Sequence, residues 1–488
     1  MCSFLFVRSR ERISDTNISE ANRIGKYRGP DSTSTLRQID SAGFHIIAVH
    51  NLLDISGHAV SQPVARGGQQ DAAFLCFNGE IYNYRQLATA DSDTDALISI
   101  YPDQGIALGK CLDGEFAAVI YDSATNQLHY WVDPFLTKPL FFGCDAAGEM
   151  FGLATNASAL RALGMSDVSL AEANSSGSIS FTDARIAQQK STPLREFDLT
   201  QHVEDYERWE RAFIQSVRKR ATHGVHKPVV FLSSGYDSGA ICLALNLLGI
   251  EYTTWSIEAN ENQQVLNDRI NLNRDLAGAE AFRIAAIDEL LRREAVSDIA
   301  VNVEPFQYVH EDAPGVFADF QADGGALGGW LLARHAATAG CRVVLSGSGA
   351  DEILSDYGFA GDKFYYHSEF GGAFPEDLES VFPWKKFYGD TQRSYLFKDE
   401  YILGRFGIEG RYPFLDFDVV QEFLWLKPKQ KNAAYKAPLD AFLRRHGYPF
   451  EENQKRGFCP SVQPVASAPD RPRGWFERVL SYFTRDSR

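Results

Sequence analysis

Two patterns of hydrophobic and polar positions follow one another along the chain. Up to about residue 190, short β-branched and aromatic segments are separated by Gly, Asp and Asn, which is typical of strands joined by turns. These segments are HIIAVHNLL, AAFLCFNGEIY, EFAAVIYD and QLHYWVD. The first part of the chain is therefore predicted to be rich in strands.

Near residue 200 the pattern changes to helical spacing. The segment DLTQHVEDYERWERAFIQSVRKRA has apolar residues on one helical face and charges on the other, which predicts a connecting helix. Apolar strands and helices then alternate in KPVVFLSS, GAICLALNLLG, YTTWSIE and CRVVLSG. This alternation predicts an α/β domain with a parallel sheet covered by helices, and a domain boundary between residues 190 and 205.

The chain thus divides into residues 1–195, residues 200–460 and a Pro/Ala-rich tail, residues 461–488. The tail ends in a segment whose large apolar residues fall on one helical face, which predicts a short amphipathic helix that docks on the protein itself or on a partner. These residues are Trp475, Phe476, Val479, Leu480 and Phe483.

Composition narrows the class of protein. With 488 residues, 44% of them hydrophobic, the chain can bury full cores, and its net charge of −16 argues against nucleic acid as a main partner. The seven cysteines are scattered without C-x-x-C spacing, which favours reduced thiols over disulfides and gives no zinc signature. No segment has the length and apolar character of a signal peptide or a membrane span, so we expect a cytoplasmic protein without a membrane partner.

The second residue is a cysteine. Once Met1 is removed, Cys2 would carry a thiol and a free α-amine, and an α-amine titrates near pH 8, so the residue can supply its own base. Taken alone, Cys2 is more simply explained as an early cysteine in a strand.

Three downstream motifs supply what a thiol attacking an amide needs. Asn78 and the backbone N–H of Gly79, in FNGEIYNY, can stabilise an oxyanion. Arg28, in YRGPD, suits the α-carboxylate of a small amino acid, and Asp93, in DSDTD, suits its α-ammonium group. Each motif alone is also explained as a surface turn, a hairpin turn or a helix N-cap.

Together, in this order behind Cys2, the motifs resemble the glutaminase domain of class II (N-terminal nucleophile) glutamine amidotransferases. LDGEFA at 112–117 and VDPFLTKPL at 132–140 extend the likeness over the whole first domain. The resemblance implies an αββα sandwich of the Ntn-hydrolase type, a catalytic Cys2 that hydrolyses glutamine to glutamate and ammonia, and Glu80 among the glutamine-binding residues. The family usually has glycine where this chain has Ser3.

A second motif, FLSSGYDSGA, follows a predicted strand and opens a predicted helix. Small residues there let backbone N–H groups surround a phosphate, and Asp237 can hold Mg²⁺ on it. A Ser/Gly-rich turn without function is the alternative. The motif resembles the S-G-G-x-D-S pyrophosphate loop of ATP pyrophosphatases, and the ATP-binding residues that this resemblance implies are Leu232, Ser233, Ser234, Gly235, Asp237, Ser238 and Gly347.

Three later segments, LSGSGADE at 345–352, GIEGRYPFLD at 407–416 and QKRGF at 454–458, resemble the asparagine synthetase pattern. The resemblance now covers nearly the whole chain. It implies ATP and Mg²⁺, with Asp237 and Asp351 as metal ligands and Lys455 offsetting charge on the phosphate of an acyl-adenylate.

The pattern breaks at the acceptor site. The family has glutamate, which handles a proton during ammonia attack, where this chain has Ser348, and a serine hydroxyl is no base without help. Either the base is dispensable, or another carboxylate replaces it, or the acceptor is not aspartate. Ser355 and Asp356 also replace two glycines. We therefore favour a specialised carboxylate, such as a sugar acid, natural product or peptide, near Ser348 and Glu352.

Two rival functions remain open. One is an amide-forming cyclase of the lasso-peptide or β-lactam synthetase kind, although such relatives often lack the nucleophilic cysteine. The other is a non-catalytic scaffold that keeps the fold. The partners expected from the main interpretation are glutamine, ATP and a carboxylate acceptor, and a homodimer is left open.

Overall fold

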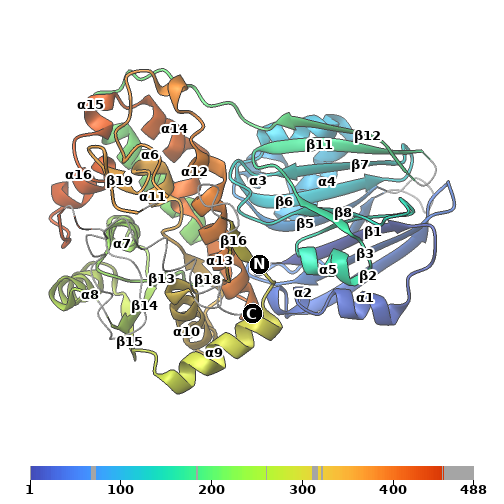
Figure 1. Ribbon diagram of the computed structural model, residues 1–488, viewed down its shortest axis with the longest axis horizontal. Helices are drawn as coiled ribbons and strands as arrows, with labels where there is room; N and C mark the ends of the chain where they lie inside the picture. The colour runs from blue at the N-terminus through green and yellow to red at the C-terminus, as the bar shows by residue number, and fades with distance from the viewer. Residues whose placement is uncertain are drawn as a thin grey trace, which may run out of the picture.

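The strand-rich first part of the chain forms two stacked antiparallel sheets (Figure 1). The computed structural model describes residues 2–66, 73–182, 185–259, 261–309, 317–319, 323–365, 367–452 and 454. The first sheet has the strand order β10-β8-β9-β1-β3-β2 and the second β12-β11-β7-β6-β5-β4. The strands of the first sheet are β1 Ser3–Ser9, β2 Ser32–Ile39, β3 His45–Leu52, β8 Phe141–Cys144, β9 Met150–Ala154 and β10 Asp167–Leu170. Those of the second are β4 Val64–Arg66, β5 Ala73–Ile81, β6 Gly114–Asp122, β7 Gln127–Val132, β11 Ser175–Thr182 and β12 Arg185–Pro193.

Both faces of each sheet are covered, which explains why the central strands read as continuous apolar runs. In β1, Phe4 and Phe6 pack between the sheets, whereas Leu5 and Val7 face helices. Helices of the first sheet's outer face are α1 Asp15–Ala21, α2 Gly25–Arg28 and α5 Ala157–Ala162, and those of the second are α3 Tyr84–Leu87, α4 Asp93–Gln104 and the 3₁₀ helix η1 Gly105–Cys111. Because successive side chains of a strand point to opposite faces, this layering confirms the predicted αββα sandwich.

The second part of the chain is built around a five-stranded sheet in the order β15-β14-β13-β18-β21, with all pairings parallel. Its strands are β13 Val229–Phe231, β14 Thr253–Glu258, β15 Glu280–Ala285, β18 Val343–Leu345 and β21 Glu409–Arg411. The predicted α/β class of this part is confirmed. The connecting helix is α6, Glu207–Thr222, and its apolar face carries Trp209, Phe213 and Val217 into the core.

Helices cover both faces of this parallel sheet (Figure 1). They are α7 Tyr236–Leu248, α8 Gln263–Ala277, α9 Glu289–Asn302, α10 Gly324–Thr338, α11 Ala350–Leu354, α12 Lys385–Tyr388, α13 Asp390–Arg405, α14 Phe417–Trp425, α15 Pro428–Lys431 and α16 Ala437–Arg445. Outside this sheet, the second part also has short strands and 3₁₀ helices. They are β16 Gln307–Val309, β17 Phe317–Asp319, β19 Gly358–Phe359, β20 Asp362–Lys363, η3 Leu378–Ser380 and η4 Pro413–Leu415.

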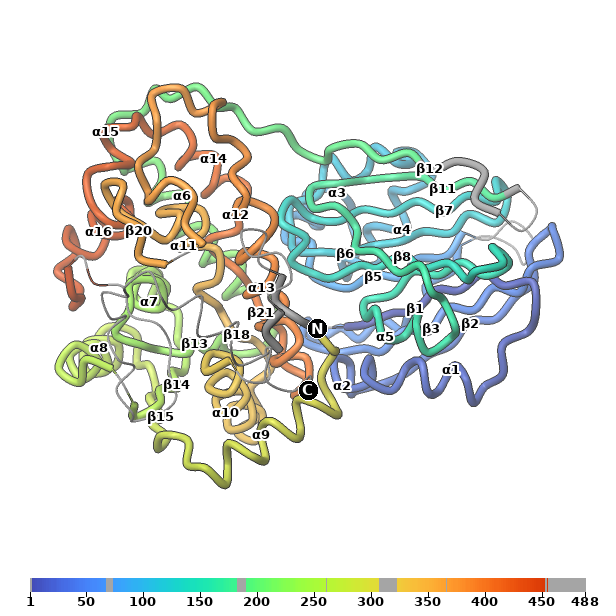
Figure 2. The backbone as a smooth tube through the Cα atoms, in the orientation of Figure 1, coloured from blue at the N-terminus to red at the C-terminus, as the bar shows by residue number. Residues whose placement is uncertain are grey.

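The two parts meet along α13 and β21. Figure 2 shows the start of β1 beside these elements, and α13 contacts both α2 and β21. The predicted tail helix and Lys455 lie outside the described residues. Among the described helices, none combines the length and the apolar character that crossing a bilayer requires.

Candidate active sites

Cys2 lies just before β1, at the junction of the two parts. Its Sγ is 3.5 Å from the backbone N of Leu53. Burial raises the pKa of the Cys2 thiol to about 11, so the thiol keeps its proton at neutral pH in this environment. A nucleophilic Cys2 therefore needs a base that accepts this proton during attack.

Asn78 and Gly79 lie near the end of β5. The side-chain amide of Asn78 is fully buried, and neither its nitrogen nor its oxygen has a hydrogen-bond partner among the described residues. Gly79 has a φ of 127°, and a Cβ there would lie 1.9 Å from the carbonyl oxygen of Glu115. A buried amide without a partner is costly, so this donor suits a ligand such as a developing oxyanion.

Glu80 and Asp93 lie next to a histidine from the second domain. Nε2 of His223, the C-cap of α6, is 2.5 Å from the Glu80 carboxylate. One side-chain ligand atom from each of Glu80, Asp93 and His223 lies within 4.8 Å of the others. Burial and the neighbouring Glu80 raise the pKa of Asp93 to about 7, and backbone N–H groups of Ile81 and Thr94 donate to its carboxylate. His223 belongs to no recognisable motif, so this contact cannot be predicted from the sequence.

Arg28 lies between the two domains, next to Cys2. Its guanidinium is buried in the junction, 2.9 Å from the Glu400 carboxylate and 3.3 Å from the backbone oxygen of Cys2. This geometry gives Arg28 a contact between α2 and α13. The sequence could not reveal this contact because Glu400 lies 372 residues away. The role of Arg28 on the α-carboxylate of glutamine stays a prediction.

The motifs LDGEFA, VDPFLTKPL and GIEGRYPFLD meet at the same junction. Lys138 donates to Glu400, at 2.9 Å, and to the backbone oxygen of Gly410, at 2.7 Å. The Glu115 carboxylate accepts from the backbone N–H of Tyr412 at 2.8 Å and from Arg220 at 2.6 Å. Buried charges need such partners, so these motifs hold the two domains together.

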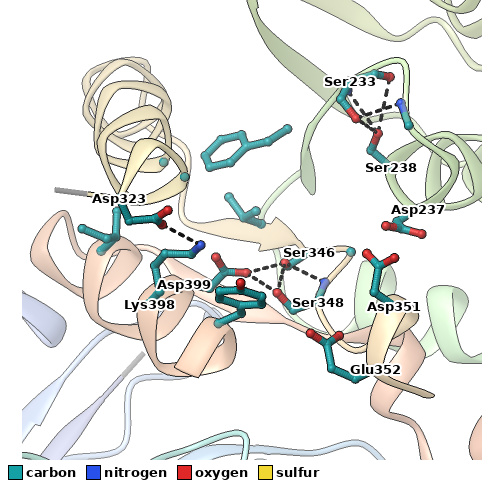
Figure 3. A pocket seen from close by; sticks show the side chains of 18 of the residues that line it. Ser233, Asp237, Ser238, Asp323, Ser346, Ser348, Asp351, Glu352, Lys398 and Asp399 are labelled. Atoms are coloured by element: carbon teal, nitrogen blue, oxygen red, sulfur yellow. Dashed lines mark hydrogen bonds and ion pairs between the residues drawn. The ribbon is translucent and has the colours of Figure 1, made fainter. Parts of the chain in front are cut away.

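A cavity of about 460 Å³ opens above the carboxyl ends of β13 and β18 (Figure 3). The serine loop after β13 forms one side, where the hydroxyls of Ser233 and Ser238 lie 2.9 Å apart. Arg269 fixes this loop by donating to the backbone oxygens of Ser233 and Gly235, each at 2.7 Å. Of the predicted ATP-binding residues, the cavity is lined by Ser233, Gly235, Asp237, Ser238 and Gly347.

The other two predicted ATP-binding residues lie behind this lining. Leu232 is buried in the core cluster. Ser234, which replaces a family glycine, is 2% exposed, and its backbone N–H donates to Glu261 at 2.6 Å, as does its hydroxyl. Glu261 thus fixes the backbone of the loop from outside its predicted motif.

Lys436 joins the two predicted metal ligands. Its Nζ lies 2.6 Å from the Asp237 carboxylate and 2.8 Å from that of Asp351, and the hydroxyl of Tyr435 also donates to Asp351, at 2.6 Å. Two carboxylates beside a buried ammonium group suit a divalent cation and the phosphates that it binds. Magnesium ligation by these aspartates stays a prediction. Lys436 was not predicted from the sequence because KNAAYKAPL carries no recognisable motif. The role of Lys455 stays a prediction, since Lys455 lies outside the described residues.

The predicted acceptor residues Ser348 and Glu352 also line this cavity. The Ser348 hydroxyl donates to Asp399 on α13 at 2.6 Å (Figure 3). The Glu352 carboxylate accepts from the hydroxyl of Tyr357. Asp399 was not predicted from the sequence, because it lies in the middle of a helix without a recognisable motif.

Asp356, which replaces a family glycine, keeps a left-handed backbone with a φ of 43°. Its carboxylate accepts from the backbone N–H groups of Glu369 and Phe370, at 2.7 and 2.8 Å, and lies 3.3 Å from the ammonium group of Lys386. These buried contacts hold the turn that follows α11 in a conformation that favours glycine.

Comparisons with known proteins match both halves of the chain. A family model for the glutamine amidotransferase domain matches residues 1–201, and one for asparagine synthase matches residues 208–385. The chain belongs to the glutamine-hydrolysing asparagine synthetase family. Its enzyme class is accordingly that of glutamine-hydrolysing carbon–nitrogen ligases.

Two proteins named as asparagine synthetases match this chain along most of their own length. A putative asparagine synthetase of Methanocaldococcus jannaschii is 27% identical over 466 residues, covering 86% of this chain and 80% of that protein. Asparagine synthetase B of Escherichia coli is 23% identical, covering 84% and 72%. A glutamine phosphoribosylpyrophosphate amidotransferase structure from B. subtilis covers 58% of this chain and 81% of its own at 13% identity, and its TM-score of 0.34 is too low to support an argument.

Proposed function

We propose that the chain transfers ammonia from glutamine to a carboxylate that it first adenylates with ATP. The observation that carries this proposal is that Asp237, Asp351 and Ser348 line one and the same cavity, with Lys436 in contact with both aspartates. Such a cavity has the groups for phosphate binding and room for an acceptor.

In the glutaminase domain, Cys2 attacks the side-chain amide of glutamine. Asn78 and the backbone N–H of Gly79 stabilise the oxyanion, Asp93 holds the α-ammonium group, and Glu80 contributes to the pocket. The unpartnered amide of Asn78 supports this assignment. Because a cyclase uses an amine of its own substrate, the presence of Cys2 together with Asn78 and Asp93 also argues against that rival.

In the synthetase domain, the acceptor carboxylate attacks the α-phosphorus of ATP and pyrophosphate leaves. Adenylation is needed because a bare carboxylate has no good leaving group. Mg²⁺ held by Asp237 and Asp351 would supply Lewis-acid stabilisation of the phosphates. Lys436 adds a fixed positive charge at the same place. Ammonia then attacks the acyl carbon, and AMP departs.

We favour an acceptor other than aspartate, because Ser348 replaces the family glutamate. The cavity that Ser348 lines is also lined by the aromatic side chains of Tyr357, Tyr365 and Tyr395. Lys398 and Asp323 form a 2.9 Å ion pair on the same wall. An aromatic and charged wall of this kind suits a larger polar carboxylate, such as a sugar acid or a peptide.

The test supplies ATP, Mg²⁺, and either glutamine or ammonium, with a panel that includes aspartate, uronic acids and peptides. We expect one carboxylate to yield AMP, pyrophosphate and amide in equal amounts. Rapid formation of asparagine would contradict the specialised acceptor. Glutamine hydrolysis at most, without AMP for any member of the panel, would instead favour the scaffold.

A Cys2→Ala variant tests the division of labour between the two sites. Glutamine-dependent amidation should vanish, because the nucleophile is gone, whereas ammonium-dependent amidation should stay within about twofold, since the variant leaves the synthetase cavity unchanged. Loss of both activities in a folded variant would contradict separate sites.

A further inference from the structure

Ser348 cannot act as a base by itself. Ammonia becomes positively charged as it attacks an acyl carbon, so a proton must leave the nitrogen before the amide is complete. A serine hydroxyl can pass a proton on, but it accepts one only when a stronger base takes its own.

Asp399 supplies a carboxylate in contact with this hydroxyl. Oδ2 of Asp399 accepts from Ser348 Oγ at 2.6 Å and from Ser346 Oγ at 2.6 Å (Figure 3). The backbone N–H of Ser348 also donates to the Ser346 hydroxyl, at 3.2 Å. The carboxylate therefore holds both hydroxyls of the segment LSGS in one orientation.

The same carboxylate lines the cavity that contains the loop for ATP. Asp399, Ser348, Asp351 and Asp237 all belong to this lining, and Lys398 beside Asp399 is paired with Asp323. Burial raises the pKa of Asp399, which makes it a stronger proton acceptor than an exposed aspartate, while the two serine hydroxyls favour its charged form. A carboxylate that lines this cavity and contacts Ser348 is placed where a proton acceptor is needed.

We propose that Asp399 is the general base of amide formation and acts through the hydroxyl of Ser348. This proposal rests on the proposed adenylation and amidation. The nitrogen of ammonia forms a bond to the acyl carbon, one of its protons passes to Ser348 Oγ, and the hydroxyl proton of Ser348 passes to Asp399. The bond between the acyl carbon and the phosphate oxygen then breaks, and AMP leaves with the electron pair. The net products are the amide, AMP and one proton, which Asp399 releases to water.

The decisive variant is Asp399→Asn, which keeps the shape of the side chain and removes its basicity. With ammonium and the acceptor identified from the panel, amide formation should fall by about a hundredfold or more, as expected for loss of a general base. Acceptor-dependent ATP–pyrophosphate exchange should stay within about twofold, because adenylation precedes the proton transfer. Trapping with hydroxylamine should then reveal accumulated acyl-adenylate.

The two serines provide a matched pair. Ser348→Ala removes the hydroxyl that passes the proton to Asp399, so its rate of amide formation should fall as much as that of Asp399→Asn. Ser346→Ala removes one hydrogen bond to the same oxygen and should cost less than about tenfold. The double variant Ser348→Glu/Asp399→Asn places a carboxylate at position 348 and should recover part of the lost rate.

The outcomes separate this proposal from the one on which it rests. Wild-type amidation in Asp399→Asn, or an equal loss of exchange and amidation, would overturn the role of Asp399 and leave the proposed function intact. If no carboxylate in the panel supports exchange with the wild-type enzyme, the proposed function itself fails, and the role of Asp399 fails with it.

Discussion

At the scale of single residues, the glutamine site contains a carboxyl group that titrates near neutral pH. Asp93 has a pKa of about 7 because it is buried beside Glu80. Burial opposes the charged form of His223 as well, but the Glu80 carboxylate outweighs it and raises the pKa of His223. Glutamine binding is therefore expected to depend on pH in the physiological range.

We predict that the affinity for glutamine falls below pH 7. Only ionised Asp93 attracts the α-ammonium group, so the dissociation constant should rise about tenfold for each pH unit below the pKa and level off above it. Calorimetric titration of the Cys2→Ala variant measures binding without turnover.

Two variants serve as controls for this pH dependence. Asp93→Asn should bind glutamine weakly, with an affinity that does not change with pH. His223→Gln keeps the Asp93 carboxyl, so its affinity for glutamine should still fall as the pH is lowered. A flat profile in the parent with Asp93 present would contradict the assigned role of Asp93.

The sequence predicted local residue types better than distant partners. Asn78, Gly79 and Asp237 lie in short motifs, and the few residues around each of them are enough to predict its chemistry. The functions of Lys436, Asp399 and His223 depend on groups brought near only by folding, as when Ser348 meets Asp399 across 51 positions. The motif of Arg28 likewise predicts a glutamine ligand but does not reveal its contact with Glu400 on α13.

At the scale of elements, the turn after α11 holds two consecutive non-glycine residues at positive φ, Asp356 at 43° and Tyr357 at 54°. Such backbone conformations cost about 1–3 kcal/mol each unless the surroundings hold them. The contacts of Asp356 with Glu369, Phe370 and Lys386 provide that hold.

We predict that Asp356→Ala lowers the free energy of unfolding by about 3–5 kcal/mol, because it leaves the ammonium group of Lys386 buried without its carboxylate. Asp356→Gly should lower the free energy of unfolding by about 1 kcal/mol less than Asp356→Ala does, since glycine adopts the left-handed conformation readily. Urea denaturation of both variants measures the difference. Equal losses would show that the backbone at this position is unstrained.

Elements with strong apolar patterns were predicted, and those without them were missed. The strands β13, β14 and β18 carry apolar runs buried on both faces, which the sequence makes visible. The strand β15 is largely exposed, and β21 is the three-residue segment Glu-Gly-Arg, so neither carries such a run. Their place in the sheet depends on pairing with distant strands rather than on local pattern.

At the scale of the whole molecule, the two domains are joined by buried charges. Glu400 is fully buried and binds Arg28, Lys138 and the hydroxyl of Tyr412, at 2.9, 2.9 and 2.7 Å. Removing one member of such a set leaves the others uncompensated in a medium that solvates them poorly.

We predict that Glu400→Gln weakens the interaction between the two domains by about 3–5 kcal/mol. The two domains should then unfold at different temperatures. Calorimetry would show two transitions where the wild-type protein shows one. Glu204→Gln is the matched control, because the Glu204 side chain is 70% exposed and its pair with Lys427 should contribute little to stability. A single unshifted transition in Glu400→Gln would contradict a structural role for this network.

The segment 409–416 limits how the chain can be recombined. The backbone oxygen of Arg411 accepts from Ser346 at 2.8 Å, a Cβ on Gly349 would lie 2.4 Å from Leu415, and Tyr412 reaches Glu115 of the glutaminase domain. A chimaera that joins this glutaminase domain to a foreign synthetase domain at the linker would bring a foreign version of this segment. Grafts that exchange acceptor preference should therefore transfer the segment together with the residues facing it in both domains.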